Sequence, residues 1–327
     1  MKKFFSLIFL SLTFFTCGNE DLISYKGLIY GTTYSIQFYN NSNENYLEEI
    51  DSILTDIDNS MSTYKPNSIL YRINKNQDIE VDNHFINVFN TSKKVFQKTN
   101  GRFDPSIGLL VNYWGFGAEK YQSSTEIKDD DIMKSLISKV GLDKFEIVDD
   151  KLIRPFDSYI DFNAIAKGYA VDEIGNFLKS KQIKNYLVEI GGEINASGIN
   201  LDKDKPWVVG IDMPRFDGKR SIYSTIELKN SSLASSGTYR NFKIDSDGNR
   251  YAHIIDPHSG FPSKTNILSV TIKGPSCIDA DAYATALHTM SINEIKDFFS
   301  KYSEISSVVI FVNDENELEE LVFNNFY

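Results

Sequence analysis

The spacing of apolar residues predicts four amphipathic helices in the first part of the chain. In residues 44–61, apolar side chains recur at steps of three and four, which places them on one face of a helix. The same period occurs in residues 84–99, where an Asn-Gly pair supplies a helix stop, and in residues 129–140. A further stripe predicts a helix over residues 164–181.

Windows rich in aromatic and β-branched residues predict strands between and after these helices. They are residues 28–39, 159–162, 185–190, 206–211, 222–229, 265–273 and 306–312, with a short final strand. Turn residues predict hairpins at Asp149-Asp150 and at Asp247-Gly248, and apolar periodicity predicts helices at 278–290 and 292–302. Strands and helices do not alternate regularly. We therefore expect an α+β fold of mixed or antiparallel sheets with packed helices, rather than a doubly wound sheet.

Residues 1–16 resemble an export signal and lie outside the predicted fold. Two lysines precede a mainly apolar stretch that is too short to span a bilayer. Cys17 follows at once, as in bacterial lipoproteins, whose cysteine is acylated and becomes the first residue of the mature protein. We expect an acylated Cys17, with the protein lipid-anchored to a bacterial membrane in the cell envelope and facing the periplasm or the exterior. An ordinary secretory signal is the alternative.

Residues 18–327 show no repeat or Pro- or Ser-rich linker, and we expect them to form one domain. If Cys17 carries lipid, Cys277 is the one cysteine left and no internal disulfide forms. Cys277 precedes an apolar helix pattern, so its predicted role is packing.

The net charge of the chain bears on the class of partner that it can bind. The chain has 34 Lys and Arg against 45 Asp and Glu, a net charge of −11, and 41% of its 327 residues are apolar. This composition is that of a folded globular protein. The acidic balance argues against nucleic-acid binding, whose footprint is basic.

Three segments carry polar residues that suggest chemistry. Asp161 to Lys167 span a predicted strand end and helix start, where free backbone N–H groups can hold an anion such as phosphate. His253 is a candidate general base, and with Asp256 and His258 it leaves open a zinc site. The third segment lies on the predicted 278–290 helix. There Asp281 and Thr285 are one turn apart and offer oxygen ligands suited to Mg²⁺, although an acid near a helix start also interacts with the helix dipole.

Three other segments have both a binding and a purely structural interpretation. Residues 61–66, MSTYKP, combine hydroxyls with an aromatic ring and suit either a ring ligand or a helix exit. Residues 101–117 are rich in Gly and aromatic residues and suit a planar ligand or a core. The Gly191-Gly192 pair is half of a nucleotide-binding fingerprint or a tight turn.

Taken together, these segments resemble the ApbE family, the FAD:protein FMN transferases. The resemblance rests on eight motifs in order: MSTYKPNS, GRFDPSIGLLVNYWGFG, IDFNAIAKGYAVDEI, YLVEIGGEINASG, WVVGI, ASSGTYRNF, HIIDPHSGFP and DADAYATAL. It implies an ApbE-like architecture related to the T-fold. It also implies an Mg²⁺-dependent enzyme that takes FAD as substrate and attaches FMN to a Thr or Ser hydroxyl of an acceptor flavoprotein in a membrane or extracytoplasmic redox system.

The resemblance also implies roles for individual residues. The metal ligands would be the Ala164 carbonyl, Asp281 and Thr285, and His253 or Asp281 would activate the acceptor hydroxyl. The implied flavin contacts are Tyr30, Tyr64, Arg102, Phe103, Asp104, Asp161, Lys167 and Ile255.

The sequence departs from the family pattern at two places. Many members have Gly-Gly where this chain has Asn163-Ala164, and some have a second Asp where it has Ala284. The second change removes a carboxylate from the expected metal site, which implies weaker metal binding. FAD hydrolysis to FMN and AMP, and flavin binding without catalysis, are the alternative functions.

Overall fold

The computed structural model describes residues 20–42, 44–119, 130–239, 242–244 and 250–327. Its helices are α1 (Leu47–Met61), α2 (Ile69–Asn74), α3 (Asn83–Lys98), α4 (Gly108–Tyr113), α5 (Asp130–Ser138), the 3₁₀ turn η1 (Leu142–Lys144), α6 (Ala166–Ser180), α7 (Cys277–His288) and α8 (Ile292–Lys301). In the part of the chain so described, none of these helices has the length and apolar character needed to cross a membrane.

Eight strands form one antiparallel sheet in the order β1-β2-β5-β6-β9-β12-β13-β14. They are β1 (Asp21–Ile29), β2 (Thr32–Asn40), β5 (Tyr186–Ile190), β6 (Glu193–Ser197), β9 (Ser231–Gly237), β12 (Ile267–Gly274), β13 (Ser306–Val312) and β14 (Leu318–Phe323). Three two-stranded ribbons accompany it: β3 (Glu146–Val148) with β4 (Lys151–Ile153), β7 (Trp207–Asp212) with β8 (Ile222–Leu228), and β10 (Phe242–Ile244) with β11 (Arg250–Ala252). The α+β prediction with antiparallel sheets is confirmed.

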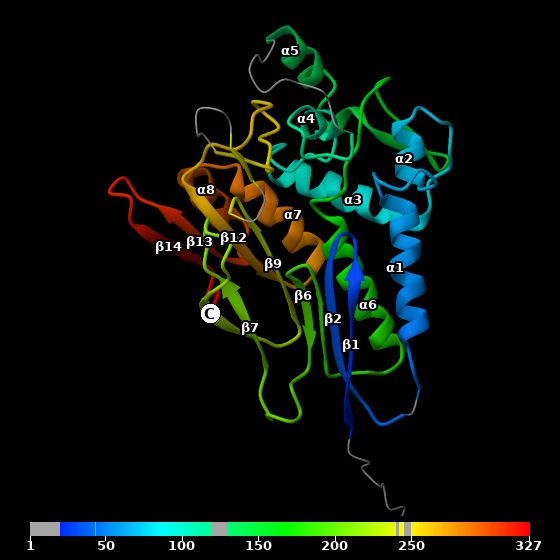
Figure 1. The fold of residues 1–327 in the computed structure, drawn as a ribbon, viewed down its shortest axis with the longest axis vertical. Coiled ribbons are helices and arrows are strands. Elements are labelled where there is room, and N and C mark those ends of the chain that lie inside the picture. Colours follow the sequence, from blue (N-terminus) through cyan, green and yellow to red (C-terminus); the bar gives the residue numbers. More distant parts are fainter. Residues whose placement is uncertain (1–19, 43, 120–129, 240–241, 245–249) are drawn as a thin grey trace, which may run out of the picture.

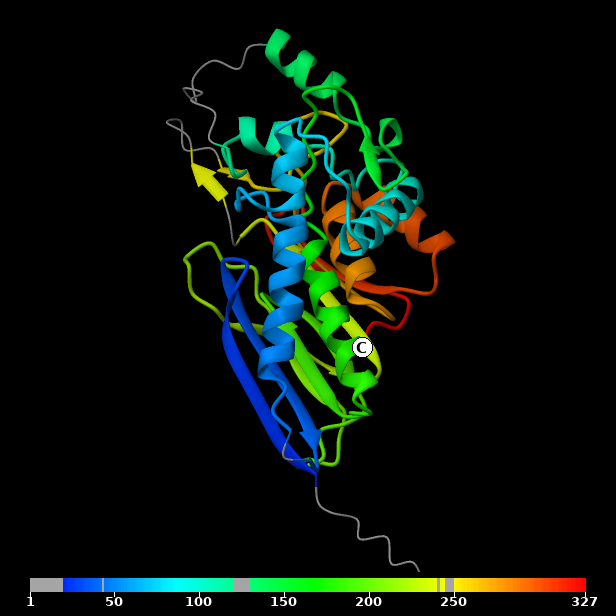
Figure 2. The same ribbon diagram turned by 90° about the vertical axis from the view of Figure 1, so that its right-hand side faces the viewer.

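Helices cover one face of the sheet and the β7–β8 ribbon covers the other. The main core lies between the sheet and α1, α3, α6 and α7. α1 and α6 lie beside each other over the sheet (Figure 2). Trp207, Ile211 and Leu228 of the ribbon pack against the opposite face in a second core. Burial on both faces explains why β5 and β13 are mostly apolar along their length rather than alternating with polar residues.

Helix caps explain where several elements begin. The side chain of Asp82 accepts a hydrogen bond from the Phe85 N–H at the start of α3, and Ser276 accepts one from the Asp279 N–H at the start of α7. Ser291 forms a capping box with Glu294 at the start of α8. The helix boundaries predicted from apolar periodicity lie within about three residues of the observed ones.

Two predictions of local structure were wrong, and a third lies outside the described residues. The 28–39 segment is not one strand, because Tyr30 (φ 52°) and Gly31 (φ 72°) turn the chain between β1 and β2. The segment 159–162 forms only an isolated bridge between Tyr159 and Ile107, and the following helix begins at Ala166 rather than Ala164. The turn predicted at Asp247-Gly248 lies outside the described residues, although β10 and β11 pair on either side of it.

Six elements were not predicted: β1 over most of its length, α2, α4, η1, β6 and the central strand β9. The β9 sequence, SSLASSG, has small and polar side chains and no apolar alternation. Only its neighbours β6 and β12 make it a strand. Gly191 and Gly192, both with positive φ, make the tight turn between β5 and β6, which agrees with the simpler of the two interpretations of that pair.

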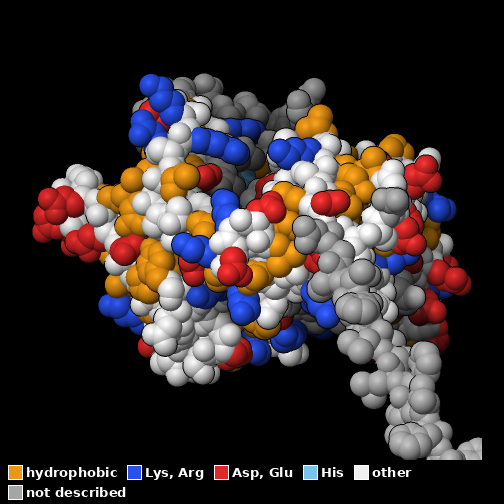
Figure 3. Space-filling model, turned by 90° about the horizontal axis from the view of Figure 1, so that it is seen from below, with side chains coloured by type: hydrophobic (Ala, Val, Ile, Leu, Met, Phe, Trp, Pro, Cys, Tyr) orange, Lys and Arg blue, Asp and Glu red, His pale blue; other side chains and the backbone are white. Residues whose placement is uncertain are grey.

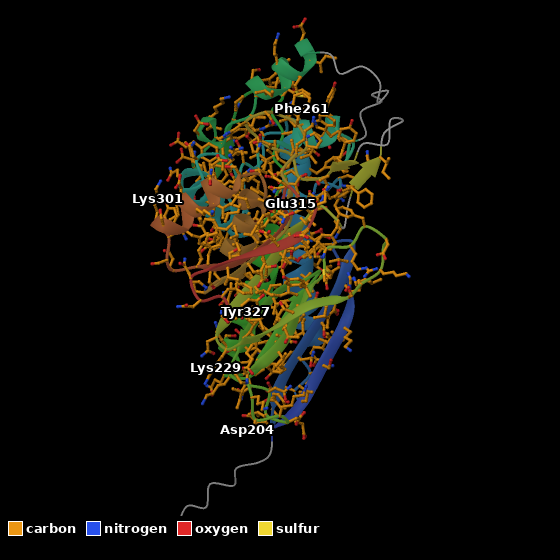
Figure 4. The ribbon with its side chains drawn as sticks, turned by 90° about the vertical axis from the view of Figure 1, so that its left-hand side faces the viewer. Asp204, Lys229, Phe261, Lys301, Glu315 and Tyr327 are labelled. Carbon is orange, nitrogen blue, oxygen red and sulfur yellow. The ribbon has the colours of Figure 1, made fainter. Side chains whose placement is uncertain are left out.

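The long axis separates a sheet-rich end from a helix-rich end (Figure 1). Asp204, in the loop before β7, marks the lower end, near the start of β1, and Phe261 lies towards the upper end (Figure 4). Much of the acidic excess is concentrated in residues 314–320 of the β13–β14 hairpin, whose acidic side chains project to one side (Figure 3).

Candidate active site

A cavity of about 610 Å³ lies where the tips of the β1–β2 and β5–β6 hairpins meet β9, α7 and the loops of the helix-rich end. Its volume falls within the range of about 300–1,000 Å³ that is typical of ligand sites. It brings together nearly all of the predicted site residues, from widely separated segments: Tyr64, Arg102, Phe103, Asp104, Asp161, Ala164, Lys167, His253, Ile255, Asp281 and Thr285.

Tyr30 is placed differently from the other predicted residues. Its hydroxyl donates a 2.8 Å hydrogen bond to the Leu54 carbonyl, and its ring packs against the main core. The next two residues, Gly31 and Thr32, line the cavity in its place. Tyr30 therefore supports the wall by fixing the hairpin tip to α1.

Charged side chains meet on the floor of the cavity. The Lys167 ammonium lies 3.0 Å from a carboxylate oxygen of Glu193 and 3.8 Å from Oδ2 of Asp281. Burial raises the pKa of Glu193 above its ordinary value; the Lys167 charge opposes this shift and the Asp281 charge adds to it. Burial by itself would lower the pKa of Lys167, but Asp281 and Glu193 raise it above its ordinary value, so Lys167 stays protonated.

The start of α6 binds an anion, and that anion is Asp281 itself. The backbone N–H of Gly168 donates a 3.0 Å hydrogen bond to Oδ2 of Asp281. Ile165, the N-cap residue, provides no side-chain cap. The sequence predicted free N–H groups for a phosphate here, and the structure shows that one of them already holds a carboxylate from α7.

Two predicted flavin contacts are tied into the cavity wall. Arg102 forms ion pairs with Asp256 at 3.0 Å and with Glu294 at 2.6 Å. Asp104 accepts hydrogen bonds from the backbone N–H and the hydroxyl of Ser106, at 2.8 and 2.6 Å. Burial raises the pKa of Asp104 to about 6, against the effect of these bonds. Both residues hold loops together as well as facing the cavity.

Other predicted contacts form an aromatic and apolar part of the wall. Tyr64 lines the cavity yet remains 61% exposed, so its ring is open to a ligand at the rim. Phe103 and Ile255 are buried in the wall. Asp161 is also buried, which raises the pKa of its carboxyl, while the backbone N–H of Asn163 donates to it at 2.8 Å and opposes the rise.

The amino-acid sequence is similar to those of known proteins over most of its length. The model of the ApbE family matches residues 30–309. The chain belongs to the ApbE family. It is 34% identical over 308 residues to the FAD:protein FMN transferase of Haemophilus influenzae, covering 89% of this chain and 88% of that one. The corresponding Vibrio cholerae protein is 35% identical over 278 residues, 83% of this chain and 82% of that protein.

A solved structure shows the same fold. The flavin transferase ApbE from Vibrio cholerae superposes with a TM-score of 0.83 at 31% identity, covering 94% of this chain and 98% of that one. The family resemblance in the sequence is thereby confirmed, and the relatives place this ApbE chain among transferases.

The zinc alternative finds no support in the geometry. Asp256 pairs with Arg102, and the His258 ring contacts the Asn100 carbonyl at 2.9 Å, while His253 lines the cavity. Among the residues described by the structure, no three or more His, Cys, Asp or Glu side chains are grouped as metal ligands.

The oxygen-rich set at α7 fits a harder cation. Ala164, Asp281 and Thr285 all line the cavity, and the Thr285 hydroxyl is held 3.1 Å from that of Ser236. One carboxylate, one hydroxyl and one backbone carbonyl are the ligand types of Mg²⁺. With a single carboxylate, such a site depends on substrate phosphates to complete it.

The sequence did not single out several residues of this ApbE site. Glu193 pairs with Lys167, and Ser235, Ser236 and Gly237 of β9 form part of the wall. Each lies in a motif that carries the family resemblance, but small hydroxyl residues and an acid after a Gly-Gly turn give no signal of their own in a single sequence.

Proposed function

We propose that this chain is an Mg²⁺-dependent FAD:protein FMN transferase, which attaches FMN from FAD to a Thr or Ser hydroxyl of an acceptor protein and releases AMP. The convergence of Lys167, His253, Asp281 and Thr285 on one cavity carries the proposal. The activity printed for the family relatives supports it.

The cavity residues suit a substrate with an aromatic ring system and a pyrophosphate. The exposed ring of Tyr64 at the rim can stack on a flavin. Lys167 supplies a positive charge for the phosphates, in a protein that is acidic overall. Ala164, Asp281 and Thr285 would hold Mg²⁺, which neutralises charge on the leaving phosphate when bound.

The proposed reaction is one displacement at phosphorus. The acceptor hydroxyl oxygen attacks the phosphorus of the FMN half, the bond from that phosphorus to the bridging oxygen breaks, and AMP leaves with that oxygen. The hydroxyl proton passes to His253, a residue type suited to general base catalysis near neutral pH. Such a base contributes about 10²–10⁴-fold to the rate.

The test is incubation of the mature protein with FAD, Mg²⁺ and candidate acceptor domains. We expect a fluorescent acceptor band and, by mass spectrometry, FMN on a Thr or Ser, with AMP released in equal amount. AMP and free FMN without any acceptor would instead identify an FAD pyrophosphatase. FAD binding with no AMP, unaffected by EDTA, would identify a flavin-binding protein without catalysis.

A pair of matched variants tests the metal assignment. Asp281→Asn should abolish Mg²⁺-dependent turnover, because it removes the single carboxylate of the set. Asp297→Asn makes the same change on the exposed face of another helix, α8, and should leave turnover unchanged. Turnover of Asp281→Asn equal to that of the control would remove Asp281 as a ligand.

We also propose export and lipid anchoring through Cys17, which follows the signal-like residues 1–16. Acyl chains contribute about 0.8 kcal/mol per buried CH₂ to membrane binding. We expect the wild-type protein in the detergent phase of a phase partition and the Cys17→Ser variant in the aqueous phase. Wild-type protein in the aqueous phase would support simple secretion.

A further inference from the structure

Glu193 is as deeply buried as Asp281 at the cavity and has no role in the steps above. Its side chain is 4% exposed, and one carboxylate oxygen accepts a 3.0 Å hydrogen bond from Lys167. The other oxygen is buried and has no hydrogen-bond partner among the described residues. Burying a carboxylate in this way is costly unless a paired charge compensates it. Lys167 is the group that does so.

The Lys167 ammonium has a second acid within reach. Oδ2 of Asp281 lies 3.8 Å away, too far for a hydrogen bond but close enough for an ion pair. Asp281 is the one carboxylate of the proposed Mg²⁺ site. A lysine bound directly to Asp281 would neutralise that carboxylate and compete with a cation for it.

We infer that Glu193 is a positioning residue, which holds the Lys167 ammonium away from Asp281 and so keeps that carboxylate available to a divalent cation. The inference rests on the proposed metal site. The backbone fixes Glu193 for this task, because it is the first residue of β6 and follows the Gly191-Gly192 turn directly. The Gly168 N–H fixes the same oxygen of Asp281, Oδ2, with a 3.0 Å hydrogen bond.

Removing the Glu193 charge should redirect Lys167. In Glu193→Gln, Asp281 is the one charged partner that the ammonium keeps among the residues the structure describes, and closing the gap from 3.8 Å to hydrogen-bond distance strengthens that pair. With an effective dielectric constant of about 20, the expected result is a roughly five- to tenfold weaker affinity for a divalent cation. Glu193→Asp keeps the charge and should restore part of the affinity.

The experiment is a titration with Mn²⁺ in the presence of saturating FAD, followed by electron paramagnetic resonance, with an FAD-only titration subtracted. Flavin fluorescence measures FAD affinity separately, and thermal unfolding confirms that each variant is folded. Glu227→Gln, the same change at an exposed position of β8 and outside the cavity lining, is the matched control and should bind Mn²⁺ as the wild type does.

A double variant separates positioning from a structural role. When Lys167→Met is added to Glu193→Gln, no ammonium remains to occupy Asp281, so Mn²⁺ affinity should return at least to the wild-type level. If the role of Glu193 is purely structural, Glu193→Gln weakens Mn²⁺ binding as much in the Lys167→Met protein as in the wild type. This additivity would overturn the inference. So would equal Mn²⁺ affinity of the wild type and Glu193→Gln. Absence of Mn²⁺ binding by the wild type would overturn the metal site itself, and the inference with it.

Discussion

Replacing Gly168 by alanine tests the contact between α6 and α7, on which the geometry of Asp281 depends. Helix propensity alone predicts that this change stabilises α6 by about 1 kcal/mol, because glycine is a poor helix former. The structure predicts the opposite. A Cβ at this position would lie 2.4 Å from the Cys277 carbonyl oxygen and 2.8 Å from Cβ of Asp281.

The cost can be worked out from these contacts. The Cys277 oxygen is backbone, so no side-chain rotation relieves the clash, and the helices must separate by about 1 Å to reach ordinary contact. Overpacking of this kind costs about 1–3 kcal/mol. The separation also stretches the 3.0 Å bond from the Gly168 N–H to Asp281, and a hydrogen bond to a charged group is worth about 1.5–3 kcal/mol. After the gain in propensity, the net destabilisation is about 2–5 kcal/mol.

The assay is urea unfolding of the mature protein, with Gly175→Ala as the matched control in the same helix. The added methyl there would lie 3.0 Å from the Tyr186 hydroxyl and 3.2 Å from Oδ1 of Asn195, both ends of side chains. The gain in helix propensity is the same as for Gly168→Ala and the clash is smaller. The free energy of unfolding of Gly175→Ala should therefore stay within about 1 kcal/mol of that of the wild type. Equal stability of the Gly168→Ala and Gly175→Ala proteins would refute the reasoning.

The remaining predictions concern buried titratable groups. Burial, reinforced by His253, lowers the pKa of His288 from 6.5 to about 4, so the folded state binds fewer protons and stability is lost as pH falls through this interval. The free energy of unfolding of His288→Leu should therefore fall less than that of the wild type between pH 6.5 and about pH 4. Parallel pH dependences of the two unfolding free energies would contradict this. Burial instead raises the pKa of Asp104 from 3.8 to about 6, so the folded state binds the extra proton and the free energy of unfolding falls as pH rises through this interval. Asp104→Asn should remove this pH dependence from the free energy of unfolding. Cys277 is buried, and burial raises its pKa well above 9.0, so a Cys17→Ser protein should show no thiol reaction with Ellman's reagent until it is unfolded.

Local signals explain which features the sequence could predict. α1 and α3 follow from apolar periodicity, because this effect acts within one or two turns of chain. The capping residues at the starts of α3, α7 and α8 are equally local signals, which the predictions from periodicity did not use. β9 could not be predicted in this way, because its small polar residues become a strand only between β6 and β12. The hairpin turn at Tyr30 was missed for a related reason, since a non-glycine residue with positive φ gives no clear turn signal.

The chemistry of the site divides in the same way. The sequence by itself determined the residue types that suit a base, an oxygen-liganded cation and a phosphate, and the order of motifs that identified the family. Only the tertiary structure decided that Glu193 faces Lys167, that the start of α6 holds Asp281, and that Arg102 is already paired with two acids. The physical reason is that an ion pair depends on distance in space, and these partners are 26 to 192 residues apart along the chain.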